Sequence, residues 1–153
     1  MTKAFILGMA VIFFTTAAMC QKTGAVDSKK LPTAETSDPR KSSAAFAEVL
    51  LRRTEIEADL ESLLVEYTED YPKVKQGRFE LALITKESER LLTVKTGDVI
   101  KLTAALGKLM VRKVDLEGDL WSLQQQFGDA HPDVKRAKRK VEIFERAIKE
   151  ILG

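Results

Sequence analysis

The sequence repeats itself with an offset of 60 residues, and this duplication constrains the fold more than any other feature. Residues 41–92 align without a gap on residues 101–152, and roughly a quarter of the aligned positions are identical. The matched residues include a Pro and a Ser in each copy, and chance similarity between helical segments would not hold these in register. The period is longer than the usual solenoid repeats, and two copies are too few for an array. We therefore interpret the chain as two copies of one structural unit.

Each copy has the apolar spacing of a helical hairpin. Apolar side chains recur at intervals of three and four residues in both arms, which is the period of a buried helix face. The pattern predicts helices over residues 42–69, 72–92, 98–129 and 132–152. The predicted seam of the first arm is the same in the two copies: Phe46, Val49, Ile56, Leu60, Leu63 and Tyr67, then Leu106, Leu109, Leu116, Leu120, Leu123 and Phe127.

Two prolines are predicted to form the bends between the arms. Pro72 and Pro132 are excluded from a helix interior but fit the first turn of a helix, so each should start a second arm. Asp98 is a candidate N-cap for the third helix. The predicted fold is all-α: two tandem homologous helical hairpins, residues 42–93 and 98–152, that form a four-helix bundle or a coiled-coil-like array.

The N-terminal segment has a different composition. Residues 1–20 carry a single charge, then an apolar run and a small-residue end, which is typical of an export signal. The run is shorter than the roughly 20 residues of a membrane-spanning helix. Residues 21–41 are mostly polar and small, and we expect a flexible linker there.

Cys20 lies at the end of this signal. Its position resembles the lipid-attachment cysteine of bacterial exported lipoproteins, and the resemblance implies a lipid tether. Cleavage after Ala18 or Cys20 and an uncleaved N-terminal anchor are the alternatives. In each case we expect an exported protein of the periplasm or cell envelope, anchored to the membrane through the lipid or the N-terminal segment.

The composition excludes several classes of chemistry. One Cys and one His among 153 residues exclude a disulfide framework, a Cys-rich zinc site and a multi-histidine centre. The net charge of +2 is too small to indicate nucleic acid as a partner. Asp129, His131 and Asp133 alternate around the second bend, and we interpret them as loop and capping residues rather than metal ligands. We expect no enzymatic activity, no catalytic or metal site, and no cofactor.

The charged residues are unevenly distributed. Residues 41–92 hold 8 Lys and Arg against 11 Asp and Glu, a net charge of −3, whereas residues 101–152 hold 11 against 8, a net charge of +3. The two copies are therefore predicted to attract each other, within one chain or between chains, with their helical seams as the contact surface. A basic cluster on the predicted fourth helix is either a solvated face or a contact for anionic envelope material: Lys135, Arg136, Lys138, Arg139 and Lys140.

One pattern occurs at both bends: Leu-x-x-Leu-x-x-x-aromatic-x-x-x-(Tyr/His)-Pro-x-Val. Its residues are Leu60, Leu63, Tyr67, Tyr71, Pro72 and Val74, then Leu120, Leu123, Phe127, His131, Pro132 and Val134. The pattern resembles the periplasmic coiled-coil segment of the bacterial polysaccharide chain-length determinant (co-polymerase) family. That resemblance implies an accessory role in exopolysaccharide or O-antigen chain-length control or export. We expect a structural or adaptor protein of the cell envelope, with this accessory role as the alternative.

Overall fold

The computed structural model describes residues 38–153, so the export segment and Cys20 lie outside the described residues. Four α-helices and one 3-10 helix follow in order: α1 (Ala44–Glu66), α2 (Pro72–Thr93), η1 (Thr96–Lys101), α3 (Ala104–Gln126) and α4 (Pro132–Leu152). The described part of the chain contains no strand, and the all-α prediction is confirmed. None of its helices combines the length and the apolar character needed to cross a membrane.

The first arms begin at hydroxyl caps that occupy equivalent positions in the two copies. The Ser43 side chain accepts a hydrogen bond from the Phe46 N–H, and the Thr103 side chain accepts one from the Leu106 N–H. The prediction that Asp98 caps the third helix is therefore wrong. Asp98 lies within η1, because a 3-10 turn takes up the residues between the hairpins and delays the start of α3 to Ala104.

The first arms also end three residues earlier than their spacing predicts. Tyr67 and Phe127 follow the last helical residues with extended backbones, at φ −123° and −131°. Their N–H groups still donate to the carbonyls of Leu63 and Leu123, which closes the last turn of each helix. The second arms begin at Pro72 and Pro132, each in the first turn of its helix.

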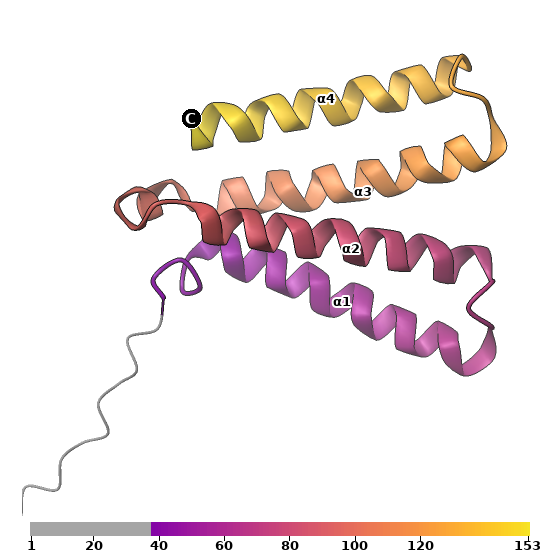
Figure 1. Ribbon diagram of the computed structural model, residues 1–153, viewed down its shortest axis with the longest axis horizontal. Helices are drawn as coiled ribbons and strands as arrows, with labels where there is room; N and C mark the ends of the chain where they lie inside the picture. The colour runs from indigo at the N-terminus through magenta and orange to yellow at the C-terminus, as the bar shows by residue number, and fades with distance from the viewer. Residues whose placement is uncertain (1–37) are drawn as a thin grey trace, which may run out of the picture. The chain divides into compact units, whose positions relative to one another are not determined.

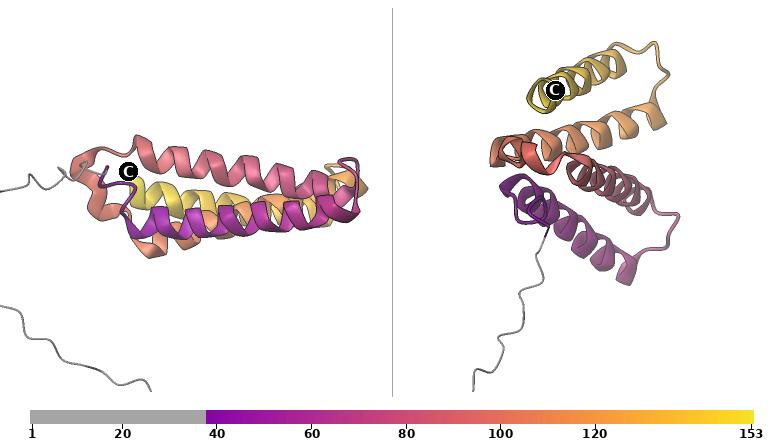
Figure 2. Two further views of the ribbon diagram at one scale, coloured as in Figure 1. Left: turned by 90° about the horizontal axis from the view of Figure 1, so that it is seen from below. Right: turned by 60° about the vertical axis from the view of Figure 1, so that its left-hand side comes forward.

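The four helices form a bundle of two antiparallel hairpins, α1 with α2 (hairpin 1) and α3 with α4 (hairpin 2), as Figure 1 shows. Helix α3 is central, because it packs against α4, α1 and α2. The hairpins lie together at the end that carries η1 and separate toward the two bends (Figure 2). We call these ends the base and the tips.

The core extends from the base to the bends, since Val74 and Val134 beside the two prolines are fully buried. Equivalent seam residues nevertheless have different surroundings. Leu60 of α1 is buried, whereas its counterpart Leu120 of α3 is half-buried. The fully buried larger side chains are Ile84, Leu91, Leu106, Met110, Ile148, Val49, Val74, Val114 and Val134.

Candidate functional site

The two tips are built alike around a stacked pair of rings. Tyr67 stacks on Tyr71 with ring centroids 4.1 Å apart, and Phe127 stacks on His131 at 4.3 Å. The stacks join the end of each first arm to the residue before Pro72 or Pro132, which restricts the bend. Tyr67 and Phe127 remain 41% and 39% exposed. Each tip therefore presents a rigid aromatic surface to solvent.

The charged residues of the second tip are bound to neighbours instead of converging on one point. Asp129 accepts hydrogen bonds from Lys138 at 2.9 Å and from Gln124 at 3.1 Å, and Asp133 pairs with Arg136. These hydrogen bonds lower the pKa of both carboxyl groups. Nowhere in residues 38–153 do three His, Cys, Asp or Glu side chains come together in a way that could hold a metal ion.

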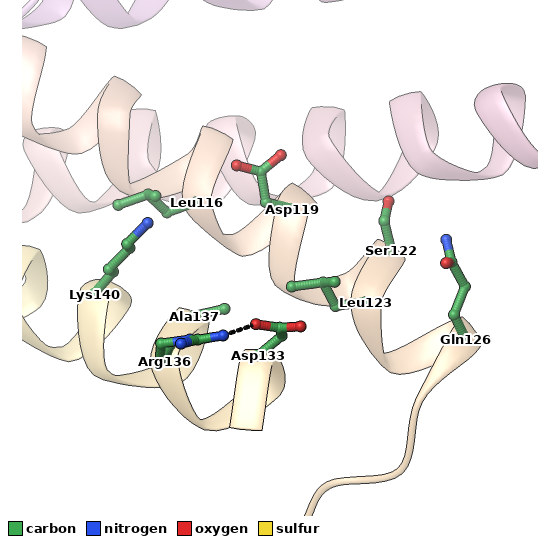
Figure 3. Close-up of a pocket in the computed structure, with 9 residues that line it drawn as sticks. All are labelled: Leu116, Asp119, Ser122, Leu123, Gln126, Asp133, Arg136, Ala137 and Lys140. Carbon is green, nitrogen blue, oxygen red and sulfur yellow. Dashed lines mark hydrogen bonds and ion pairs between the residues drawn. The ribbon is translucent and has the colours of Figure 1, made fainter. Parts of the chain in front are cut away.

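A groove of about 500 Å³ lies between α3 and α4 beside this tip (Figure 3). Leu116 and Leu123 form part of its apolar lining, while Arg136 and Lys140 of α4 lie opposite Asp119 of α3. Hairpin 1 has a related groove of about 280 Å³. Seven of its lining residues lie 60 positions before residues of the first groove: Ile56, Asp59, Leu63, Lys73, Gln76, Gly77 and Glu80.

The basic residues of the predicted cluster on the fourth helix differ in their ion-pair partners. Lys138 pairs with Asp129, and Arg139 lies 3.4 Å from Glu142 on the same helix. Arg136 is held by Asp133. Lys135 and Lys140 are exposed, and within residues 38–153 they form no ion pair. Within the described residues these two lysines thus keep free ammonium groups, and Lys140 borders the groove of Figure 3.

The strongest electrostatic feature is a buried ion network between the hairpins. The Lys113 ammonium of α3 lies 2.6 Å from Glu87 of α2, 3.2 Å from Glu145 of α4 and 3.6 Å from Glu117. Arg90 of α2 reaches Glu145 at 3.2 Å. Lys113 is 9% exposed and Glu87 only 3%. The network therefore ties three helices together near the base.

The network shifts the pKa values of its members in opposite directions. Burial disfavours the charged form of Lys113, but the hydrogen bond to Glu87 and the nearby carboxylates outweigh it and raise the pKa. Burial also opposes ionisation of Glu145, yet hydrogen bonds from Arg90 and Lys113 lower its pKa. Burial and the neighbouring carboxylates raise the pKa of Glu117. Lys113 is therefore the cation that compensates the negative charge of the surrounding carboxylates.

In the sequence, Lys113 interrupts the apolar seam of the third helix as Arg53 interrupts that of the first, but the pattern does not reveal the network. A charged residue in an apolar seam was the one sign in the sequence that Lys113 has a special environment. The seam pattern could not identify the partners of Lys113, because Glu87 and Glu145 come from other helices. Among the described residues Arg53 has no such surroundings: its ion-pair partner is Glu57, one turn along α1, at 2.8 Å.

A second set of contacts joins the hairpins farther along α3. Arg52 of α1 lies 2.9 Å from Asp115 of α3. Phe79 of α2 stacks on Trp121 of α3 with ring centroids 5.6 Å apart. Trp121 is thus part of the contact between the hairpins within one chain.

The two copies pack against each other within the chain, but their ion pairs do not follow their net charges. Arg52–Asp115 and Arg90–Glu145 join bases of hairpin 1 to acids of hairpin 2, and only the Glu87–Lys113 pair runs the other way. The surplus negative charge of hairpin 1 and the surplus positive charge of hairpin 2 therefore lie outside this interface.

Comparison with protein-family models, with curated proteins and with solved structures finds no significant match to this chain.

Proposed function

We propose that this chain is a non-enzymatic structural or adaptor protein of the bacterial cell envelope, exported and tethered by its N-terminal segment. The tether holds the base of the bundle, and the two tips meet the partner. The proposal is carried by one observation: the chain enters the bundle at the end opposite both tips (Figure 1).

The entry point is held in place by a single side chain. The Arg40 guanidinium donates hydrogen bonds to the carbonyls of Leu92 and Val94 at the end of α2, and it also pairs with Asp38. Residues 38–41, which the sequence pattern assigns to the linker, are therefore part of the folded base. A helix of 23 residues such as α1 extends about 35 Å. The bundle is a spacer of this length between its tether and its tips.

The disposition of charge supports a structural role. The buried charges between the hairpins neutralise one another across helices, as in the contact of Lys113 with Glu87 and Glu145. They tie the hairpins together, and the same residues also line an open groove of about 670 Å³ between α2, α3 and α4. Rigid hairpins with duplicated aromatic tips suit a protein that spaces or joins other components.

A role in polysaccharide chain-length control or export is the second candidate. The stacked rings at both tips belong to the pattern that resembles the chain-length determinant family. The exposed basic residues of α4, Lys135 and Lys140 among them, would suit acidic glycans.

Fractionation of cells and cross-linking from defined positions test these proposals. The wild-type chain should sediment with membranes, and Cys20→Ser should release it or block its processing. A photo-reactive side chain at Asp70 or Ala130, in the tips, should capture protein partners, whereas one at Ile100, which is 87% exposed in η1 at the base, should capture lipid.

The outcomes separate the candidates. Polysaccharide-export components among the proteins captured from the tips favour the second candidate. Identical captured molecules at the tips and the base would exclude the spacer arrangement. A wild-type chain found entirely in the soluble fraction, with Met19 or Gln21 as its first residue, would exclude the lipid tether.

A further inference from the structure

An apolar surface is exposed where α1 reaches the first tip. Leu64, Val65 and Tyr67 are 37%, 85% and 41% exposed. Glu61 and Glu66 lie beside them along the chain and are exposed as well, and within residues 38–153 neither carboxylate forms an ion pair. We call these five residues the α1 patch. Exposed apolar side chains that gather in this way, with free charges beside them, are typical of a contact site.

A second exposed apolar side chain, Ile143 of α4, has bases around it. Ile143 is 51% exposed. The residues three, four or seven positions away share its helix face, and four of them are exposed bases: Arg136, Arg139, Lys140 and Arg146. We call Ile143 and these bases the α4 patch. The first two bases have acidic neighbours on α4, whereas Lys140 and Arg146 form no ion pair within residues 38–153.

Neither patch is required by the repeated fold, because the other copy carries different residues at the equivalent positions. Leu64 and Val65 correspond to two Gln residues, at positions 124 and 125 of the second tip. Arg139 of the α4 patch corresponds to Phe79, which is packed against Trp121 inside the bundle. A hairpin of this kind therefore forms with polar residues at its tip, and the exposed apolar residues of the α1 patch are not needed to build it.

The two patches cannot meet within one chain. Helix α4 packs against α3, and α1 packs against α2 and α3. Figures 1 and 2 show α4 and α1 at opposite edges of the bundle. One edge thus carries apolar surface with free acids, and the other carries apolar surface with free bases. Surfaces of opposite charge at opposite edges can bind each other only between two molecules.

A contact between the patches would differ from the packing of the two hairpins inside the chain. The internal packing joins Arg52 to Asp115 and Phe79 to Trp121. The part of α3 that is equivalent to the α1 patch, residues 124–127, is exposed and takes no part in that packing. The proposed contact therefore lies nearer the tip than the internal one, and it does not need the close approach of backbones found at Gly107.

The α1 patch also has room beside it for the side chains of a partner. Glu61 and Leu64 line an open groove of about 650 Å³ between α1 and α2. Acids outnumber bases among its charged lining residues, which are Glu57, Glu61, Glu89, Arg78 and Lys86. Arg78 is already paired with Glu69 at 2.7 Å. The groove therefore suits the long stems and positive charges of Lys or Arg side chains.

We propose that the α4 patch of one copy of this chain binds the α1 patch of the next copy. Ile143 packs on Val65 and Tyr67, and Lys140 and Arg146 pair with the carboxylates of the α1 patch. The surplus positive charge of hairpin 2 then meets the surplus negative charge of hairpin 1, which the internal ion pairs leave outside their interface.

The contact is heterologous, because the two patches differ, so it adds copies head to tail into a ring or a filament. The inference goes beyond the proposed envelope role and does not rest on it, since the patches belong to the bundle alone.

Cross-linking between single cysteines tests the proposal on the full chain in detergent, with Cys20→Ser as the background. Chains carrying Val65→Cys, mixed with chains carrying Ile143→Cys and treated with a short bis-maleimide, should give a cross-linked dimer. A chain with both substitutions should give a ladder of higher oligomers. Gln125→Cys is the matched control, because Gln125 is the exposed counterpart of Val65 at the second tip, and it should give no product with Ile143→Cys.

The other outcomes count against the proposal. A product with Gln125→Cys as strong as with Val65→Cys would mean that the contact is not specific to the α1 patch. A dimer from Val65→Cys alone, as strong as from the mixture, would mean a symmetric tip-to-tip contact. If no product forms at about 1 mM protein, while anionic vesicles protect Ile143→Cys from maleimide, the α4 patch binds a lipid surface instead.

A charge exchange provides a second, independent measurement, read as mass by sedimentation. Glu61→Arg with Glu66→Arg should abolish association, and adding Lys140→Glu with Arg146→Glu to the same chain should restore it. The circular dichroism of each variant should stay that of the wild type, because these residues are exposed. Association that survives the first pair of substitutions, or that the second pair fails to restore, contradicts the pairing of the two patches.

The apolar part of the contact is measured by Val65→Gln, which introduces the side chain that the second tip carries at the equivalent position. Losing the burial of this Val should weaken association about tenfold. Gln125→Val at the second tip is the control and should leave the association constant unchanged. Equal association of the wild type and Val65→Gln would overturn the packing of Ile143 on the α1 patch.

Discussion

Replacing Lys113 with Met removes the cation at the centre of the buried network. The substitution keeps the side-chain length and loses the charge-assisted hydrogen bond to Glu87, which spans 2.6 Å. Such a bond contributes about 1.5–3 kcal/mol, and leaving a buried partner unpaired brings the cost to about 3–5 kcal/mol. Arg90 stays 3.5 Å from Glu87 and retains part of the compensation, so we expect the lower end of this range.

The matched control is Arg53→Met, the same change at the equivalent position of copy one. Within residues 38–153, Arg53 pairs with Glu57 alone, on its own helix, and both side chains are more than two-fifths exposed. An exposed pair of this kind contributes about 0.3–0.5 kcal/mol. Urea unfolding of the compact unit Ala34–Gly153, followed by far-ultraviolet circular dichroism, measures both variants.

The double variant Lys113→Met with Glu87→Met separates the pair from its surroundings. Removing both charges should recover about 1–3 kcal/mol relative to the two single losses combined, because Glu87, the most deeply buried carboxylate of the network, is then no longer left beside an empty cation position. If Lys113→Met costs no more than Arg53→Met, or if the two losses simply add, the network does not hold the hairpins together as we infer.

Three further results are expected, each from unfolding measurements on the same unit. Gly107→Ala should cost about 1–3 kcal/mol of stability by overpacking against α1. Gly97→Ala is the control: no atom lies within 4 Å of the added Cβ, so stability should change by less than about 0.5 kcal/mol. Equal effects of the two substitutions would mean that α1 and α3 do not approach closely. Leu60→Ala should cost about 2–5 kcal/mol and more than the half-buried Leu120→Ala. The reverse order would contradict the deeper burial of Leu60. The hydrogen bonds from Arg40 lower the pKa of Asp38 from 3.8 to about 2, so the stability that this pair contributes is present above pH 3.8 and is lost as the pH falls toward 2. Asp38→Asn should remove this acid-dependent part of the stability. If the dependence of stability on pH stays unchanged in this variant, the Arg40–Asp38 pair at the base contributes nothing.

The elements of the fold could be predicted because their signals are local. Apolar spacing of three and four residues and a Pro at the start of each second arm placed all four helices. The wrong N-cap of the third helix also came from local sequence. Asp98 was chosen as a cap although Ser43, which caps α1, has its equivalent in Thr103. Comparing the two copies position by position would have corrected it.

The ends of the first arms were misplaced for a different reason. Spacing alone extends these helices to residues 69 and 129, since nothing in residues 67–69 forbids a helix. The stacking of Tyr67 on Tyr71 and of Phe127 on His131 instead favours an extended residue at each position. Helix propensity does not predict this stacking, because the two rings meet only after the chain has turned.

The burial of equivalent residues could not be read from the repeat. Leu50 and Met110 occupy the same place in their hairpins, yet one is 47% exposed and the other fully buried. Lys113 has three carboxylates around it, and Arg53 has one. Equivalent sequence positions share their local conformation, but what covers them depends on the neighbouring hairpin.

Local sequence was therefore sufficient for the helices, their bends and the hairpin topology, because hydrogen bonds within a helix, the fixed φ of Pro and the spacing of apolar residues act over a few residues. The order in which the hairpins stack and the buried network around Lys113 required the folded bundle. These features depend on side chains up to 63 positions apart, such as Arg52 and Asp115, that meet only when one copy packs against the other. Two homologous hairpins allow more than one such packing, and the observed one is favoured by the close approach at Gly107 and by the neutralisation of buried charges.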